Sequence, residues 1–339
     1  MQLAGKRRTR LIPHTEVNVM LNIGMVGMGG ISQAHREAWK QIPEARVVCV
    51  CDIRPEKARA ASEDIGGTPY TDFDEMLAKE SFDILDICLP TYLHADFAVK
   101  ALGKGIHVVT EKPISLKYED VDRVYAAARA AGKNFMVAQV LRFWREYVVL
   151  KDAFDTGRYG RLMSGAMTRL GHTPKWSWDD WMKDEKRSGL VPFDLHIHDL
   201  DFMIYAFGTP KDVVVHRAKD EGQDYFNVVY EYPDFFITAE AAWYPCDFTF
   251  RAGFRFQFEN AVLEYVDNKL TIYRRDGTNE TLPDEENANV NGINLPATNG
   301  YYNELRYFVD CVLEGRPCDR VKPEELKTVL GIIRKLNER

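Results

Sequence analysis

Long hydrophobic runs are missing from the sequence, whose apolar stretches all fall well short of the roughly 18 residues that a membrane-spanning helix requires. An excess of positive charge is also missing, because 51 acidic residues outnumber 44 basic ones and give a formal net charge of -7. These two absences predict no membrane partner and no nucleic-acid partner. The basic N-terminal stretch has no apolar segment behind it, which argues against a secretory signal. We therefore expect residues 1–19 to form a disordered extension of a cytoplasmic protein.

The cysteines form no familiar metal or redox motif. The chain has six of them, and the closest two, Cys49 and Cys51, have the wrong spacing for the common zinc and redox patterns. Most of the others lie in apolar runs or near the end of the sequence. We expect buried free thiols, as is usual in a reducing compartment, and we predict no metal site.

The length of 339 residues exceeds that of one typical core, so two domains are expected. Residues 20–140 alternate short apolar runs with helical patterns, which predicts βαβ units and a parallel sheet. We interpret this part as a doubly wound α/β domain of the Rossmann type. The expected strands are Leu21–Val26, Arg46–Cys51, Ile84–Leu89, Ile106–Thr110 and Asn134–Ala138.

Residues 141–339 have a different character. The stretch Phe254-Arg255-Phe256-Gln257-Phe258 alternates apolar and polar residues, which is typical of a strand with one buried and one exposed face. Further segments share this pattern, so we predict an α+β domain with a large, open, mostly antiparallel sheet. Two closing helices are expected at about 302–313 and 323–336, and the sequence leaves open whether they pack back onto the first domain.

A glycine-rich stretch, Gly27-Met28-Gly29-Gly30-Ile31-Ser32, follows the first expected strand and opens a helix. It matches the dinucleotide-binding pattern with serine at its third position. Gly27 allows a tight turn, and Gly29 lets the backbone approach a pyrophosphate. The start of the helix favours the negative phosphate charge. A glycine-rich connection without function is the alternative, but the strand before it and the helix after it favour a cofactor site.

An acidic residue, Asp52, ends the second expected strand, which is where a ribose-binding carboxylate belongs. Its charge repels a 2′-phosphate and favours NAD, whereas nearby Arg54 keeps NADP open. The expected cofactor-binding set adds positions at the carboxyl ends of the neighbouring strands. This set is Gly27, Met28, Gly29, Gly30, Ile31, Asp52, Ile53, Arg54, Pro90, Thr91, His94, Glu111 and Lys112.

The stretch Glu111-Lys112-Pro113 places a lysine at the same edge of the parallel sheet. Pro113 restricts the backbone of Lys112 to extended conformations. A lysine beside a nicotinamide can present its charge to a reacting oxygen. A solvated loop lysine is the alternative that this stretch alone leaves open.

A second cluster of ionisable residues spans Asp194 to Asp201 and contains His196 and His198. In a regular helix Asp194, His198 and Asp201 share one face, which predicts a histidine base supported by carboxylates. Zinc sites on helices need histidines four residues apart, and these are two apart, so metal binding is disfavoured. A helix start capped by Asp194, with His198 merely buried, is the remaining alternative.

Taken together, the glycine stretch followed by His35, the Glu111-Lys112-Pro113 stretch and the Asp194 to Asp201 cluster resemble the Gfo/Idh/MocA family of sugar and cyclitol oxidoreductases. The resemblance covers the chain from Met20 onward. It implies a Rossmann domain and an α/β domain whose open sheet often forms oligomer contacts, hence a homodimer or homotetramer. It also implies that Lys112, Asp194 and His198 line the active site.

The expected activity is hydride transfer between NAD(P) and a cyclic polyol or sugar. In it His198 acts as general base, Asp194 orients that histidine, and Lys112 holds the reacting oxygen. An NAD-dependent glycosidase and a non-catalytic dinucleotide sensor are the alternatives. Further expected substrate contacts are Arg142, Arg169, His172, Trp181, His196 and Tyr302, where His196 replaces the glycine of many family members.

Overall fold

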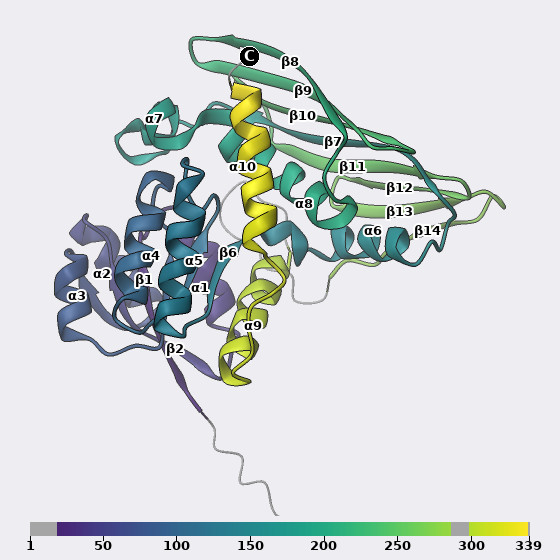
Figure 1. Cartoon of the computed structure of the whole chain (residues 1–339). Coiled ribbons are helices and arrows are strands. Elements are labelled where there is room, and N and C mark those ends of the chain that lie inside the picture. The colour runs from purple at the N-terminus through teal and green to yellow at the C-terminus, as the bar shows by residue number, and fades with distance from the viewer. Residues whose placement is uncertain (1–18, 286–297, 338–339) are drawn as a thin grey trace, which may run out of the picture.

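The computed structural model describes residues 19–285 and 298–337, so the expected N-terminal extension lies almost wholly outside the described residues. Figure 1 shows two bodies, each built around one sheet, and the predicted fold class is confirmed. Among the described residues, no helix has the length and apolarity to cross a membrane. All six cysteines are free thiols, and Cys246 is the exposed one.

The first body is a parallel sheet of six strands in the order β3-β2-β1-β4-β5-β6. The chain order reverses between β1 and β4, and ligands of such sheets bind beyond the carboxyl ends of the strands at this switch point. The short β3 was not predicted. The strands are β1 (Leu21–Val26), β2 (Ala45–Cys51), β3 (Thr68–Tyr70), β4 (Ile84–Ile87), β5 (His107–Glu111) and β6 (Phe135–Ala138).

Helices cover this sheet because their apolar sides pack on its buried strands, which are rich in valine, isoleucine and leucine. α1 begins at Ser32 directly after the glycine stretch, and Pro55 occupies the first turn of α2. The helices are α1 (Ser32–Trp39), α2 (Pro55–Ile65), α3 (Phe73–Lys79), η1 (Thr91–Leu93), α4 (His94–Leu102) and α5 (Glu119–Ala131).

The second body is a sheet of eight strands in the order β14-β13-β12-β11-β7-β10-β9-β8. Its neighbours are antiparallel except β7 and β10, which run parallel. In β11, as predicted, the phenylalanines are buried and Arg255 and Gln257 are exposed. The strands are β7 (Leu162–His172), β8 (Asp212–Asp220), β9 (Gln223–Glu231), β10 (Phe236–Tyr244), β11 (Arg251–Phe258), β12 (Ala261–Val266), β13 (Lys269–Arg274) and β14 (Asn279–Thr281).

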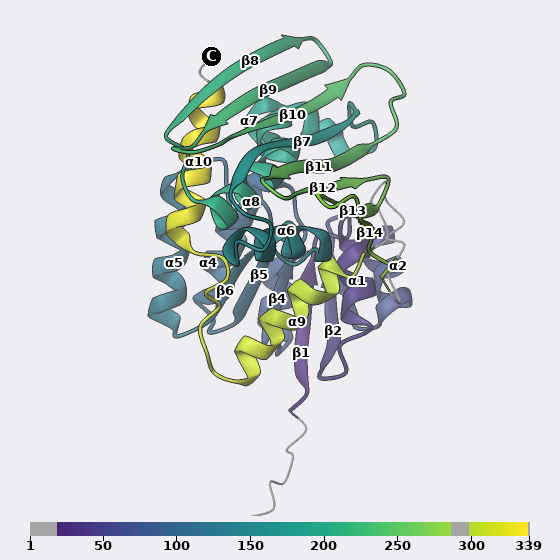
Figure 2. The same ribbon diagram turned by 90° about the vertical axis from the view of Figure 1, so that its right-hand side faces the viewer.

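Helices of the second half of the chain lie between the large sheet and the first body (Figures 1 and 2). α9 packs against α1, and α10 packs against α5 and α8, so the last helices of the chain contact both bodies. These elements are η2 (Val140–Arg142), α6 (Arg145–Asp155), η3 (Trp178–Lys183), α7 (Glu185–Ser188), a π-helical turn η4 (Pro192–His196), α8 (Ile197–Phe207), α9 (Gly300–Leu313) and α10 (Pro323–Asn337).

Candidate active site

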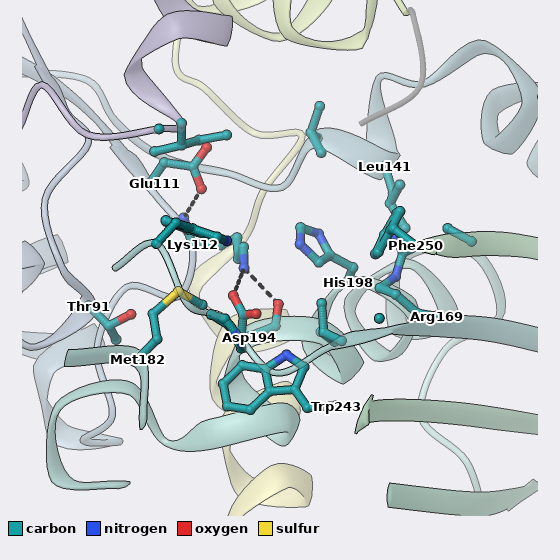
Figure 3. Close-up of a pocket in the computed structure, with 18 of the residues that line it drawn as sticks. Thr91, Glu111, Lys112, Leu141, Arg169, Met182, Asp194, His198, Trp243 and Phe250 are labelled. Atoms are coloured by element: carbon teal, nitrogen blue, oxygen red, sulfur yellow. Dashed lines mark hydrogen bonds and ion pairs between the residues drawn. The ribbon is translucent and has the colours of Figure 1, made fainter. Parts of the chain in front are cut away.

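A cavity of about 590 Å³ lies where the carboxyl edge of the parallel sheet meets the large sheet. Both bodies supply its walls, as Figure 3 shows for part of the lining. Its size is that of an ordinary small-molecule site. The lining includes Gly30, Ile31, Thr91, Glu111 and Lys112 from the first body and Arg169, His172, Trp181, Asp194, His198 and Trp243 from the second.

The glycine turn after β1 has the shape that a pyrophosphate requires. Gly27 has a φ of 86°, and a Cβ there would lie 2.6 Å from the carbonyl oxygen of Cys88, so only glycine fits. A Cβ on Gly29 would meet nothing within 4 Å, which leaves this part of the backbone open to an approaching ligand. The Ser32 hydroxyl donates to the Gly29 carbonyl at 2.7 Å and fixes the start of α1. The N-terminus of α1 therefore offers its dipole to a phosphate beside an accessible backbone.

Asp52 follows β2 and is held by three donors. Its Oδ2 accepts a hydrogen bond from the Met28 backbone N–H at 2.8 Å, and Oδ1 accepts one from the Arg54 backbone N–H at 2.9 Å. The Arg54 guanidinium donates to both oxygens at 2.9 Å. Although burial favours protonation of Asp52, these bonds hold its pKa below the usual value. Asp52 is thus an ionised acceptor just beyond the carboxyl end of β2, where we predicted a ribose, and the Arg54 guanidinium is paired with it.

A buried cluster lies under the strand ends at β4 and β5. The His35 Nδ1 lies 2.9 Å from Asp86 Oδ2, and its Nε2 lies 3.0 Å from Glu111 Oε1. Burial is the largest single influence and opposes the imidazolium, but the charges and hydrogen bonds of Asp86 and Cys88 together outweigh it and raise the pKa of His35 well above 6.5. Protonated His35 therefore donates to both carboxylates. Glu111 Oε2 in turn accepts from the Lys112 backbone N–H at 3.0 Å, which ties the cluster to the lysine.

Glu304, on α9, is the unusual member of this neighbourhood. It is fully buried, and neither of its carboxyl oxygens has a hydrogen-bond partner among the described residues. Burial and the charge of Glu111 raise its pKa well above 4.5. Tyr301, one turn earlier on α9, packs its ring 5.8 Å from that of His35. Helix α9 thus covers the buried side of the site and places a neutral carboxyl group there.

Lys112 is anchored across the boundary between the two bodies. Its Nζ donates to the Asp194 carbonyl oxygen at 2.7 Å and to Asp194 Oδ1 at 3.2 Å, as Figure 3 shows. An ammonium group has three N–H donors, so one is left for another ligand. The lysine is therefore held in the cavity wall with one N–H donor to spare. The Lys112–Pro113 peptide bond that follows it is cis.

His198 lies beside Lys112 in the same cavity (Figure 3). Burial, together with the charges of Lys112 and Arg169, lowers the pKa of His198 well below 6.5. The ring is therefore neutral near pH 7. Its Nδ1 is buried without a partner among the described residues, so Nε2 is the nitrogen available to a ligand in the cavity. A neutral imidazole beside a lysine ammonium can accept a hydroxyl proton while the ammonium stabilises the oxygen.

Comparison with known proteins identifies the family of both domains. A model of an oxidoreductase family with an NAD-binding Rossmann fold matches residues 21–139, and a model of the GFO/IDH/MocA C-terminal domain matches residues 147–278. The chain belongs to the Gfo/Idh/MocA family. The NAD-binding character of the first domain is thereby shown, and the glycine turn and Asp52 fit that cofactor.

Three similar proteins illustrate the range of this family. The chain is 28% identical over 192 residues to 2,7-anhydro-N-acetylneuraminate hydratase of Mediterraneibacter gnavus, covering 56% of this chain and 50% of the relative. It is 29% identical over 189 residues to myo-inositol 2-dehydrogenase of Thermotoga maritima, covering 56% and 55%. The chain thus matches about half the length of these curated relatives. An oxidoreductase of Agrobacterium radiobacter in complex with NAD+, L-tartaric acid and magnesium has a TM-score of 0.79 at 15% identity, covering 94% and 95%.

The remaining expected cofactor contacts of this family member surround the same edge. Thr91 follows β4 in the cavity lining, and Pro90 precedes it at the start of η1. Ile53 is exposed beside Asp52. The buried His94 has its ring nitrogens 2.7 Å from the Pro113 carbonyl oxygen and 2.6 Å from that of Leu89, so it braces the strand ends.

The expected carboxylate support of His198 is not what the structure shows. The π-helical turn η4 carries Asp194, and the regular helix α8 begins only after it, so the assumed spacing fails. The Asp194 side chain bonds Lys112. Asp201 faces away and accepts from the Arg142 guanidinium at 2.7 Å and 2.8 Å. Neither carboxylate bonds to His198 among the described residues.

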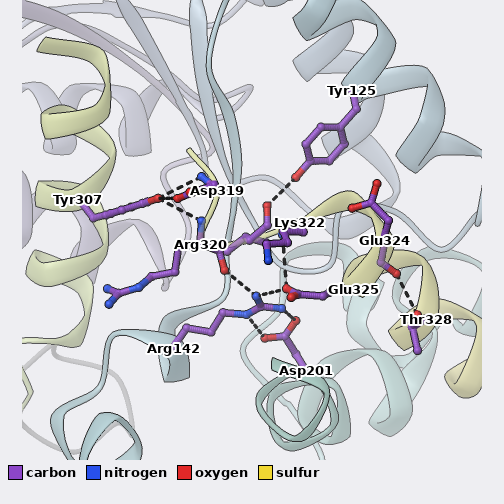
Figure 4. A network of polar contacts seen from close by, with 11 residues as sticks. Tyr125, Arg142, Asp201, Tyr307, Asp319, Arg320, Lys322, Glu324, Glu325 and Thr328 are labelled. Atoms are coloured by element: carbon purple, nitrogen blue, oxygen red, sulfur yellow. Dashed lines mark hydrogen bonds and ion pairs between the residues drawn. The ribbon is translucent and has the colours of Figure 1, made fainter. Parts of the chain in front are cut away.

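Three expected substrate contacts do not line the cavity. Arg142 is fully buried in a network with Asp201 and Glu325, which Figure 4 shows. His196 is fully buried and shares a hydrogen bond with the hydroxyl of Tyr230. Tyr302 sits next to the residue that does line the cavity, Tyr301, because α9 turns the earlier side chain inward. We correct these three predictions accordingly.

Three other expected contacts do line the cavity, namely Arg169, His172 and Trp181. Arg169 donates to Asp199 at 2.8 Å and 3.2 Å and to the Tyr147 hydroxyl at 3.2 Å. Sequence reasoning missed several aromatic members of the wall. Alternation along the strands could have indicated two of them, and the others come from loops and helices. The missed residues are Trp144, Tyr147, Trp243, Phe250, Tyr265 and Tyr301.

Proposed function

We propose that the protein is a dehydrogenase that moves a hydride between NAD and a hydroxyl-bearing carbon of a cyclic polyol or sugar. The observation that supports this most strongly is the pairing of Lys112 Nζ and the neutral His198 ring in one cavity. That cavity adjoins the strand edge where a Rossmann domain binds its dinucleotide. When bound, the nicotinamide accepts or returns the hydride.

The protein residues handle the proton and the oxygen. His198 Nε2 accepts the hydroxyl proton, because its Nδ1 is buried and the ring is neutral. The spare N–H of Lys112 stabilises negative charge on the oxygen as it forms. Asp194 holds that lysine through its carbonyl and carboxylate oxygens, so its role is to position Lys112 rather than His198. Such acid–base assistance contributes about 10²–10⁴ in rate.

We further propose that NAD is preferred over NADP. Asp52 is ionised and occupies the ribose position, where it repels a 2′-phosphate. Arg54, the residue that could accept that phosphate, donates its guanidinium to both oxygens of Asp52. A 2′-phosphate must therefore break an existing ion pair before it gains a partner.

The test is NADH absorbance on purified protein, supplied with NAD or NADP and a panel of inositols, aldoses, deoxysugars and glycosides. Products are identified by mass spectrometry. Reduction of NAD with a polyol or sugar supports the proposal, and the cofactor comparison settles the preference. If NAD binds but no member of the panel is oxidised, cleaved or hydrated, the dehydrogenase assignment fails and a dinucleotide sensor takes its place.

A second candidate is a reaction in which NAD is reduced and reoxidised within one turnover, as in an NAD-dependent glycosidase. The similarity to a protein named as a hydratase supports this second candidate. The same Lys112 and His198 can serve the oxidation step. The two candidates differ in the readout, because this one converts a glycoside or anhydro-sugar with no net NADH.

We also propose a cytoplasmic homodimer or homotetramer. The large sheet exposes apolar side chains that a second copy could cover, among them Met163, Phe236, Val266 and Tyr273. The free thiols fit a reducing compartment. Light scattering after size-exclusion chromatography tests the assembly, and a monomer at micromolar concentration contradicts it.

A further inference from the structure

We propose that the substrate is an uncharged sugar or cyclitol held against tryptophan side chains, and that the cavity discriminates against phosphorylated and carboxylated sugars. This inference rests on the proposed function and names the substrate class of the same site. It depends on the charges that face the cavity and on the aromatic side chains that line it.

The cationic groups on the substrate side are already compensated. Lys112 is paired with Asp194 at 3.2 Å, and Arg169 is paired with Asp199 at 2.8 Å through two of its nitrogens. Recognition of a phosphate or carboxylate usually rests on arginine or lysine groups that offer charge as well as donors. Both pairs offer donors to hydroxyl groups, but neither brings net positive charge.

The buried side of the cavity adds negative charge. One imidazolium, that of His35, lies between two carboxylates, Asp86 and Glu111. Glu111 is also part of the cavity lining. The negative charge that His35 leaves uncompensated in this cluster stabilises a cationic nicotinamide ring nearby. It repels an anionic group of the substrate at the same place. An anionic substrate therefore meets unfavourable potential where the reacting carbon must sit.

Two further ionisable groups of the described lining, Lys57 and His172, do not change this balance, and His198 is neutral. Lys57 is exposed on α2, which directly follows Asp52, so it belongs to the dinucleotide half of the cavity. His172 shares a 3.3 Å contact between its Nδ1 and the Phe248 carbonyl oxygen, which leaves Nε2 for a hydroxyl group. The sequence of residues 286–297 contains no lysine, arginine or histidine.

The aromatic side chains supply what an uncharged ring needs. Trp176, Trp181, Trp243 and Phe250 all line the cavity. Flat aromatic faces bury the C–H faces of a cyclic polyol and leave its hydroxyl groups to polar partners at the edge. Trp176 remains 63% exposed although it lines the cavity, so a ligand can cover it further. Trp178, in the same segment, is 44% exposed and does not line the cavity.

The first test compares neutral ligands with their anionic derivatives. The pairs are glucose with glucuronate and myo-inositol with inositol 1-phosphate, titrated against the full-length protein saturated with NADH. Isothermal calorimetry measures each dissociation constant. We expect at least one neutral member to bind, and every neutral member that binds to do so at least about tenfold more tightly than its anionic partner. Equal or tighter binding of the anions overturns the inference, and so does failure of every neutral member to bind.

The second test compares two tryptophans. Trp176→Ala should raise the dissociation constant of the tightest neutral ligand by about three- to tenfold, as expected for the loss of an aromatic contact. Trp178→Ala is the matched control and should change it by less than about twofold. Equal effects of the two substitutions contradict a stacking role for Trp176.

The binding readout separates this inference from the proposed function. A neutral sugar that binds more tightly than its charged partner, yet is never oxidised or converted, supports the charge selection and refutes the dehydrogenase. Rapid oxidation of a phosphorylated or carboxylated sugar supports the dehydrogenase and refutes the charge selection.

Discussion

Two clusters of charged residues meet at the junction of the two bodies, and they differ in whether they face the cavity. In the first, shown in Figure 4, Arg142 donates to Asp201, Glu325 and the Arg320 carbonyl oxygen, so each of its three nitrogens has an acceptor. In the second, the cavity of Figure 3, Lys112 keeps one N–H without an acceptor among the described residues.

This difference distinguishes a structural ion pair from a group that is available for catalysis. A fully buried charge held only by protein acceptors stabilises one arrangement of the chain and does not face a ligand. A group with spare hydrogen-bonding capacity beside a cavity is a candidate for catalysis. The sequence predicted a catalytic role for Lys112 and a substrate contact for Arg142. The structure separates them, because Lys112 lines the cavity and Arg142 is fully buried outside it. The predictions below use this contrast, from the largest expected effect to the smallest.

The largest effect is expected where the bonding is incomplete. Lys112→Ala and His198→Ala should each lower kcat by about 10²–10⁴, because each removes a group that acts on the reacting hydroxyl. Steady-state NADH formation measures kcat with the best substrate. NAD affinity, followed by fluorescence titration, should change little in both variants. Turnover within about threefold of the parent in both variants refutes their assignment.

The buried cluster around Arg142 should instead control stability. Arg142→Met leaves the buried carboxylate of Asp201 without its partner, which costs about 3–5 kcal/mol of unfolding free energy. Urea unfolding followed by circular dichroism measures the change. Lys112→Met is the matched control, because its pair is partly exposed and should cost about 1 kcal/mol or less. A larger loss in Lys112→Met than in Arg142→Met reverses the comparison.

Glu304 is the exception that sharpens the comparison, because it is buried and unbonded yet lies outside the cavity lining. Its folded pKa lies well above 4.5, so the folded state keeps a proton that the unfolded state loses as pH rises. This costs stability above pH 4.5, by about 1.4 kcal/mol per pH unit up to the folded pKa. Glu304→Gln removes the penalty, so its stability advantage over the parent should grow by at least about 1 kcal/mol between pH 5 and pH 8.

Urea unfolding at the two pH values measures this advantage. Glu63→Gln serves as the control, because Glu63 is exposed on α2 and its replacement makes the same chemical change without touching the buried surroundings of Glu304. If the advantage of Glu304→Gln is the same at pH 5 and pH 8, Glu304 is not protonated in the folded protein.

The smallest effect concerns the pH profile. Because the pKa of His198 lies well below 6.5, the ring is already in the neutral form that a base requires. We therefore expect kcat/KM for oxidation to change by less than about twofold between pH 6.5 and pH 7.5, with the acidic limb well below pH 6.5. A limb centred near pH 6.5 indicates a solvated histidine and contradicts the buried position.

Local sequence patterns predicted much of the fold and the cofactor half of the site. The turn at Gly27, the carboxylate at Asp52 and the strand before Lys112 depend on residues close in sequence. The partners of Arg142 and His196 do not, because Glu325 and Tyr230 lie far along the chain and no spacing rule reaches them.

Helix register explains the remaining differences. The assignment of Asp201 assumed a regular helix through Asp194, and the π-helical turn η4 breaks that assumption. On α9 the prediction is wrong by one position, because Tyr301 lines the cavity in place of the predicted Tyr302. The aromatic lining shows the same limit, since Trp243 and Tyr265 come from different strands and face one cavity only after the sheet has formed.

The packing of α9 against α1 has a consequence for how the protein is made. His35 and Glu111 leave the ribosome early, whereas Tyr301 and Glu304, which close their buried side, are among the later residues to emerge. A nascent chain therefore carries this cluster of charges without its cover until α9 has been translated. A chain cut short before α9 lacks Tyr301 and Glu304, so the proposed activity requires translation through α9.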